Sequence, residues 1–175
     1  MIARLRRRRS QRPDTGASAV EFALLSVPLL LILFGIIDYG IWFADSISAR
    51  QAVRDGARRG VVEQFTSGSC TGQADLANLA CTVKEAMEPI SANTFVKISV
   101  AGGPGGAGGA TWAVGNTVRV CAISQHQAIM PLVPFPADGA SRTKVEMPIE
   151  QATGTGSRST VQDADPTGQN WSWCP

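Results

Sequence analysis

The stretch that decides the fold is Thr15-Gly16-Ala17-Ser18-Ala19-Val20-Glu21-Phe22, together with the apolar run from Ala23 to Ile37 that follows it. Six arginines lie within the first twelve residues of the chain, ahead of this stretch. A basic head before an apolar run is typical of a secretory signal or a signal anchor. Ala17 to Tyr39 is long enough to cross a hydrocarbon core of about 30 Å. Because an excess of Lys and Arg stays on the cytoplasmic side, we predict a cytoplasmic N-terminus and a C-terminal domain outside.

Glu21 is the unusual residue of this segment. A carboxylate near the start of a membrane span costs a few kcal/mol on insertion scales, which makes it a functional candidate. The alternative is that Glu21 lies at the level of the lipid headgroups and is simply solvated. Its position alone does not choose between these two interpretations.

Three linked signals resemble a known family. Gly16 followed by a small residue, with Glu21 five places on and Phe22 after it, is similar to a prepilin peptidase site of the type IV pilin superfamily. The segments 27–40 and 52–60 resemble the TadE-like family, the second through its Gly56-Ala57-Arg58 signature. These are minor pilins, or pseudopilins, of tight-adherence pili and their secretion apparatus. The resemblance covers roughly residues 15–60.

The resemblance implies a function in pilus assembly and in surface adhesion or secretion. Prepilin peptidase would cleave between Gly16 and Ala17, and Glu21 of one subunit would then neutralise the freed amine of Ala17 on a neighbour. The implied partners are that peptidase, other pilin and pilus-assembly subunits, and membrane lipid. The implied location is the cell membrane, with a single span, and possible entry into an extracellular pilus.

The charge distribution and the cysteines restrict which other functions the chain could have. Ten basic and thirteen acidic residues follow Gly16, so the basic character belongs to the leader and nucleic-acid binding is not expected. Four cysteines in an extracytoplasmic segment predict two disulfides, with three possible connectivities, among Cys70, Cys81, Cys121 and Cys174. No Cys-x-x-Cys spacing supports a metal site, and we expect the single histidine, His126, in a loop or at the surface.

The predicted fold class is α+β. A long helix from residue 17 to about residue 64, half of it in the membrane, is expected to pack on a small antiparallel sheet beside a second helix over residues 73–87. Alternation of apolar and polar residues predicts strands over 95–100, 117–124 and 142–150, the last at a sheet edge because of Pro148. We divide the chain into a leader (1–16), a membrane helix (17–40), an extracytoplasmic pilin-like domain (41–151) and a flexible tail (152–175).

Small residues form a stripe on the outer half of the long helix: Ala52, Gly56, Ala57 and Gly60. This small-xxx-small spacing allows two backbones to approach closely. The partner could be the protein's own sheet, which we favour, or another subunit. Arg50, Arg54 and Arg58 share another face, which is either solvated or binds an acidic partner.

The tail ends in Trp171, Trp173 and Cys174, which either dock on the domain, the interpretation we favour, or offer an exposed contact. The sequence holds no nucleophile elbow, nucleotide-binding glycine motif or His-Glu-x-x-His. We therefore expect no enzymatic activity and no cofactor. Two rivals to the pilin hypothesis remain open: a signal-anchored extracytoplasmic binding domain with no pilus role, and a small secreted enzyme.

Overall fold

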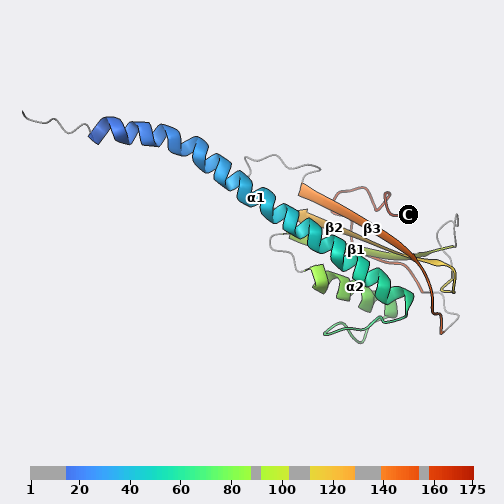
Figure 1. Cartoon of the computed structure of the whole chain (residues 1–175). Helices are drawn as coiled ribbons and strands as arrows, with labels where there is room; N and C mark the ends of the chain where they lie inside the picture. Colours follow the sequence, from blue (N-terminus) through green and yellow to red (C-terminus); the bar gives the residue numbers. More distant parts are fainter. Residues whose placement is uncertain (1–14, 88–91, 103–110, 129–138, 154–157) are drawn as a thin grey trace, which may run out of the picture. The chain divides into compact units, whose positions relative to one another are not determined.

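The computed structural model describes residues 15–87, 92–102, 111–128, 139–153 and 158–175. Its elements are α1 (Thr15–Val61), α2 (Asp75–Met87), β1 (Ala92–Ala101), β2 (Thr117–His126), β3 (Ala140–Pro148) and β4 (Val161–Gln162) (Figure 1). The chain divides into two compact units, Met1–Ile37 and Asp38–Pro175. The predicted α+β class, with a long first helix, a short second helix and an antiparallel sheet, is confirmed.

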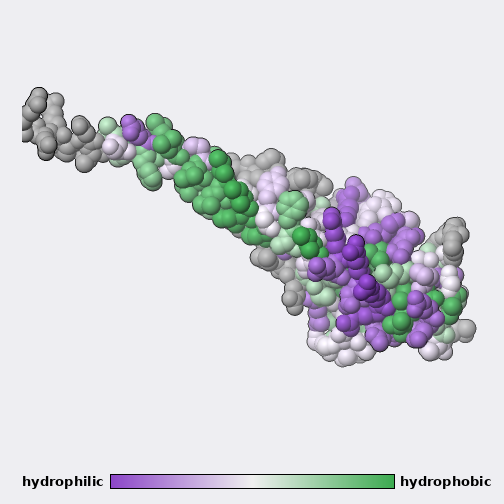
Figure 2. Space-filling model, in the orientation of Figure 1, coloured by the Kyte–Doolittle hydropathy of each residue, from purple (hydrophilic) through white to green (hydrophobic). Residues whose placement is uncertain are grey.

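The part of α1 in the first unit is apolar and exposed. Leucine, isoleucine, valine and phenylalanine side chains point outward along it, and they give the segment the continuous hydrophobic surface in Figure 2. Pro28 lies inside this helix without ending it. Helix α1 has the length and composition to cross a membrane, and its most apolar stretch buries nothing in the structure.

The sheet has the strand order β3-β2-β1-β4, and all of its pairs are antiparallel. Val96 and Ile98 of β1 and Val118 and Val120 of β2 are fully buried on one face, as the alternation predicted. Strand β3 pairs only with β2 among the described residues, so Pro148 lies at an edge, where its missing N–H costs no sheet hydrogen bond.

Both helices of the second unit cover the same face of the sheet (Figure 1). Helix α1 supplies Ala49, Ala52, Val53, Ala57 and Val61 to the core, and α2 supplies Leu76, Leu79, Ala80, Val83 and Met87. The α2 residues are those that its helical periodicity predicted. Small side chains on α1 and larger ones on α2 allow the two helices to lie close together.

The opposite face of the sheet is covered by the C-terminal segment. Trp171 and Cys174 are buried against Cys121, Ile123 and Ala140. We expected a flexible tail from residue 152 onward. In the structure residues 158–175 instead add strand β4 to the edge of β1 and bury a tryptophan, so this segment is part of the folded unit. Docking of the terminal tryptophans was the favoured alternative, and Trp171 is docked.

One sequence-based expectation falls outside the described residues. It is the basic leader, of which residues 1–14 are not described.

Candidate assembly segment and the contacts that hold the domain

Gly16 is the second residue of α1, and the predicted processing site therefore lies at the start of the helix. Apart from its chain neighbours and the backbone of its own helix, no described atom lies within 4 Å of the place where a Cβ on Gly16 would be. Ala17 and Glu21 are four residues apart in the same helix, so they share a face. Phe22 is 71% exposed, and Glu21 is also exposed. Residues 16–22 are all exposed in this chain.

The exposed apolar surface continues beyond Phe22. Leu24, Leu25, Val27 and Leu29 are each more than half exposed. A contiguous apolar surface of this extent is rarely left in water and marks a membrane or protein contact. The helix therefore has the features of a membrane anchor.

The small-residue stripe packs inside the second unit. Ala52, Gly56, Ala57 and Gly60 are all buried. A Cβ on Gly56 would come within 2.3 Å of Val83 Cγ2, and one on Gly60 within 3.2 Å of Leu79 Cδ2. Both neighbours belong to α2, and Val118 of β2 lies 3.5 Å from the same position on Gly60. The stripe thus meets the protein's own domain, first through α2 and then through the sheet.

The four cysteines form two disulfides of different kinds. Cys70 pairs with Cys81 over a separation of 11 residues, and Cys121 pairs with Cys174 over 53 residues. Of the three connectivities left open by the sequence, the structure has this one. The first bond joins a loop to α2, whereas the second fastens the C-terminal segment to β2.

The arginine face of α1 is exposed. Arg50, Arg54 and Arg58 all lie at the surface. The neighbouring Asp55 carboxylate pairs with Arg59 instead, with Nε and Oδ2 2.7 Å apart. This exposed pair contributes little to the free energy of unfolding.

Arg158 contacts a set of residues that the sequence alone did not reveal. We call this set the Arg158 clasp, and its members are Glu63, Phe65, Asp75 and Trp112. The guanidinium of Arg158 lies 4.6 Å from the ring centroid of Phe65 and 4.5 Å from that of Trp112. The same group donates to Glu63 Oε1 at 2.8 Å and to Asp75 Oδ2 at 3.0 Å. Cation–π contacts and pairing with two separate carboxylates suit a planar guanidinium with several N–H donors. This arginine therefore connects the end of α1, the start of α2 and the C-terminal segment.

Glu63 is the acidic centre of this clasp. It has a left-handed backbone, with φ of 58°, directly after α1. Its carboxylate accepts hydrogen bonds from the backbone N–H and the hydroxyl of Thr153 and from Arg158. Burial acts to raise the pKa of Glu63, but these hydrogen bonds and the Arg158 charge outweigh it and hold the pKa at about 2, against an ordinary 4.5.

Asp163 and Asp165 anchor the rest of the C-terminal segment. Asp163 accepts from Lys84 Nζ on α2 and from the backbone N–H of Val96 on β1, both at 2.7 Å. Asp165 accepts from the backbone N–H groups of Thr167 and Trp171 at 2.8 Å. Burial opposes the charge of Asp165, but these hydrogen bonds lower its pKa overall. The sequence signal was present, since both acids stand in a stretch otherwise rich in small polar residues.

His126 corrects one expectation. It is the last residue of β2 and is only 6% exposed, so the prediction of a loop or surface position is wrong. Its Nδ1 lies 3.9 Å from Oδ2 of Asp45, a buried residue of α1. The alternation of β2 continues to residue 126, which is why this side chain faces inward.

Comparison with known proteins matches one part of the chain. Residues 16–58 match the family model described as TadE-like protein. This part of helix α1 is similar to the TadE-like family. The TadE-like match covers about a quarter of the chain and includes the predicted processing site, the apolar span and most of the small-residue stripe. No curated protein and no solved structure matched the chain. The family suggests a pilin-type protein associated with the Tad pilus and with other pilus subunits.

Proposed function

We propose that this protein is a minor pilin, or pseudopilin, that is cleaved by prepilin peptidase between Gly16 and Ala17 and then acts in assembly of a tight-adherence pilus. The observation that carries the proposal is the coincidence of the TadE-like match at 16–58 with a helix whose first half is apolar and exposed. In this proposal the protein is not an enzyme, and its contribution to adhesion or secretion is structural.

The proposed topology places the leader in the cytoplasm, residues 17–40 in the membrane, and the second unit outside. Cleavage hydrolyses the Gly16–Ala17 peptide bond and leaves a charged amine on Ala17. Glu21 of a neighbouring subunit would pair with that amine. Two charges in a low dielectric each pay a large desolvation cost, and an opposite charge at contact distance offsets it. Because Ala17 and Glu21 share one face of α1, a single helix–helix contact could bring both groups into register.

To test this proposal, the protein is recovered from membranes of cells with and without an active prepilin peptidase. Mass spectrometry then determines its N-terminal residue. We expect a start at Ala17 only when the peptidase is active. Gly16→Leu should abolish cleavage, because a large side chain replaces the residue that lets the backbone enter a tight enzyme cleft. Gly35→Leu is the matched control, since Gly35 also lies in the exposed part of α1 and, apart from its chain neighbours and the backbone of its own helix, has no described atom within 4 Å of its missing Cβ.

The second measurement is surface piliation with Glu21→Gln. We expect normal cleavage at Ala17 but a loss of assembly, because the amide cannot neutralise the amine. An intact leader in the presence of active peptidase, together with indifference to Glu21→Gln, would support the alternative of a signal-anchored binding domain without a pilus role.

A further inference from the structure

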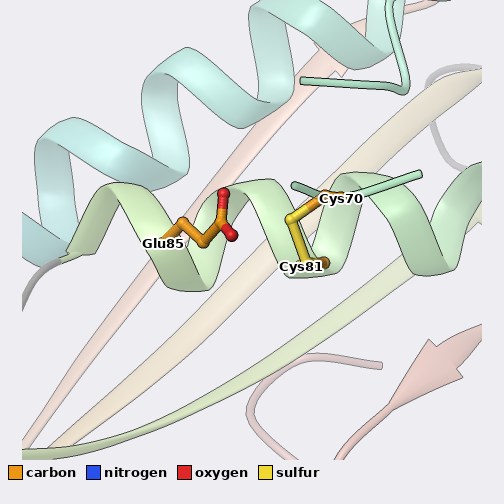
Figure 3. Close-up of side chains that lie close together, drawn as sticks. All are labelled: Cys70, Cys81 and Glu85. Carbon is orange, nitrogen blue, oxygen red and sulfur yellow. A yellow bond between two sulfur atoms is a disulfide. The ribbon is translucent and has the colours of Figure 1, made fainter. Parts of the chain in front are cut away.

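The two disulfides differ in how easily a reagent can reach them. Cys121 and Cys174 are both fully buried. Cys81, by contrast, is partly exposed on α2 and lines a surface hollow of about 340 Å³, while its partner Cys70 is 2% exposed. Figure 3 shows the Cys70–Cys81 bond at the side of α2, next to the loop that carries Cys70. Of the cysteines in the two bonds, Cys81 is therefore the one that a reagent in the hollow can approach.

Glu85 lies beside this bond. It follows Cys81 by one helical turn, and a carboxylate oxygen and both sulfurs lie within 4.8 Å of one another (Figure 3). Ser69 donates a hydrogen bond to the Glu85 carboxylate from the same loop as Cys70. While the sulfurs are bonded to each other they offer no thiolate to a metal, so in this state the three groups do not form a metal site.

The other charges that line the hollow compensate each other. Lys84 Nζ lies 2.7 Å from Asp163 Oδ1. Among the described residues that line the hollow, Glu85 is therefore the one whose charge is not compensated by an oppositely charged lining residue. The hollow next to the disulfide has a net negative charge. A reagent that approaches Cys81 meets a negative field.

We propose that the Cys70–Cys81 bond is a thiol-exchange site and that Glu85 makes it selective against anionic thiols. A thiolate of the reagent attacks Sγ of Cys81, forms a mixed disulfide with it, and releases Cys70 as a thiolate. A second reagent thiolate then attacks the reagent sulfur, forms the oxidised reagent disulfide, and releases Cys81 as a thiolate. Both released thiolates take up protons from water according to their pKa. Negative charge is shared among three sulfurs as each bond exchanges, and a carboxylate within 4.8 Å opposes that charge.

The test measures reduction of each disulfide in the full chain in detergent by two small thiols, cationic cysteamine and anionic 2-mercaptoethanesulfonate. Alkylation followed by peptide mass spectrometry assigns the rates to the two bonds, and the rates are corrected for thiolate fraction. We expect Cys70–Cys81 to react at least about tenfold faster than Cys121–Cys174, because only the former is accessible. At low salt we expect cysteamine to be favoured about 3- to 10-fold, and this preference to shrink at high salt.

Three variants isolate the charge of Glu85. Glu85→Gln should remove most of the preference for the cationic thiol. Ser69→Ala removes the hydrogen bond but keeps the carboxylate, so the preference should remain. Glu150→Gln changes an exposed acid that does not line the hollow, and it should also leave the preference intact.

Equal rates for the two disulfides would overturn the proposal, because they would mean that reduction requires opening of the whole domain. Equal acceleration of both thiols by Glu85→Gln would also overturn it, because loss of a contact rather than loss of charge would then explain the effect. These outcomes do not depend on cleavage at Gly16, so the proposed pilin function stands or falls separately.

Discussion

At the scale of single residues, the Arg158 clasp decides how the end of α1 is joined to the rest of the domain. Glu63 is held by Thr153 and Arg158, and Arg158 is enclosed by two aromatic rings. Trp112 is 1% exposed and Phe65 is 7% exposed. The Glu63–Arg158 ion pair therefore lies against aromatic rings from which water is largely excluded. Removal of one partner would leave the other charge poorly compensated.

The first prediction concerns acid stability. The pKa of Glu63 is about 2 in the folded state and 4.5 ordinarily, so its charged form stabilises the fold above pH 4.5, and that stabilisation is lost as the pH falls from 4.5 towards 2. Glu63→Gln should lower the free energy of unfolding at pH 7 by on the order of 2 kcal/mol. The difference from the native protein should shrink below pH 4. Urea unfolding followed by circular dichroism from pH 7 to pH 3 measures this.

Glu150→Gln is the matched control for this prediction, because Glu150 is exposed. The free energy of unfolding of Glu150→Gln should change with pH in parallel with that of the native protein. Glu146 and Asp165 also have lowered pKa values, owing first to the Arg119 hydrogen bond for Glu146 and to the Thr167 and Trp171 hydrogen bonds that outweigh burial for Asp165. The native protein therefore loses stability in acid for several reasons, and the prediction fails if Glu63→Gln tracks the native curve at every pH.

At the scale of elements, the contact between α1 and α2 depends on the absence of a side chain. Alanine normally stabilises a helix relative to glycine by about 1 kcal/mol. At Gly56 the added Cβ would lie 2.3 Å from Val83 Cγ2, so the helices or the valine must move. Overpacking of this kind costs typically 1–3 kcal/mol.

The second prediction follows from this contact. Gly56→Ala should destabilise the second unit by about 1–2 kcal/mol in spite of its better helix propensity. Val83→Ala in the same chain removes the clashing methyl group, so the double variant should be more stable than the sum of the two single effects predicts. Denaturant unfolding of all four proteins completes this cycle. Gly40→Ala, where no described atom outside the neighbouring helix backbone lies within 4 Å of the new Cβ, should be neutral or stabilising. A Gly56→Ala variant that behaves likewise would refute the argument.

The elements could be predicted from the sequence wherever the pattern is local. The apolar face of α2 repeats with the helical period, and β1 alternates cleanly, so both were placed correctly. Strand β4 has two residues and no alternation, and only its pairing with Lys97 and Ile98 makes it a strand. His126 was misplaced because the predicted strand ended at residue 124, whereas β2 continues to residue 126 and its alternation turns this side chain inward, near Asp45 of α1.

The candidate assembly segment shows the same division. Gly16, Glu21 and the small-residue stripe are local motifs that can be read from the sequence alone, and all of them except Gly60 lie within the match at 16–58. The Arg158 clasp joins residues up to 95 positions apart, and no local spacing marks it. The connectivity of the cysteines is likewise a property of the folded chain.

At the scale of the whole molecule, the sheet of the second unit is covered on both faces, by the helices on one side and by the C-terminal segment on the other. Strand β2 carries buried side chains towards both layers, such as Val120 towards the helices and Ile123 towards Trp171. The Cys121–Cys174 bond fixes the second layer.

The third prediction compares the two disulfides. In the chain-entropy account, a cross-link over 53 residues stabilises by about 4 kcal/mol and one over 11 residues by about 3 kcal/mol. Cys121→Ser with Cys174→Ser should therefore cost more than Cys70→Ser with Cys81→Ser. Only the former should make the segment beyond residue 158 sensitive to protease. Limited proteolysis with mass spectrometry distinguishes the two, and equal cleavage of that segment in both double variants would contradict the prediction.

The late position of Cys174 in the chain has a consequence for biogenesis. A chain is synthesised from its N-terminus, so β1, β2 and β3 can pair before the segment that covers their second face exists. During that interval Phe95, Ile123 and Ala140 would be bare, as would the edge of β1 that β4 later occupies. Exposed apolar strands with an open edge are prone to aggregation. A nascent chain of this protein therefore has a vulnerable period that lasts until Trp171 and Cys174 have been synthesised, and a chaperone that shields the sheet would be needed most just before then.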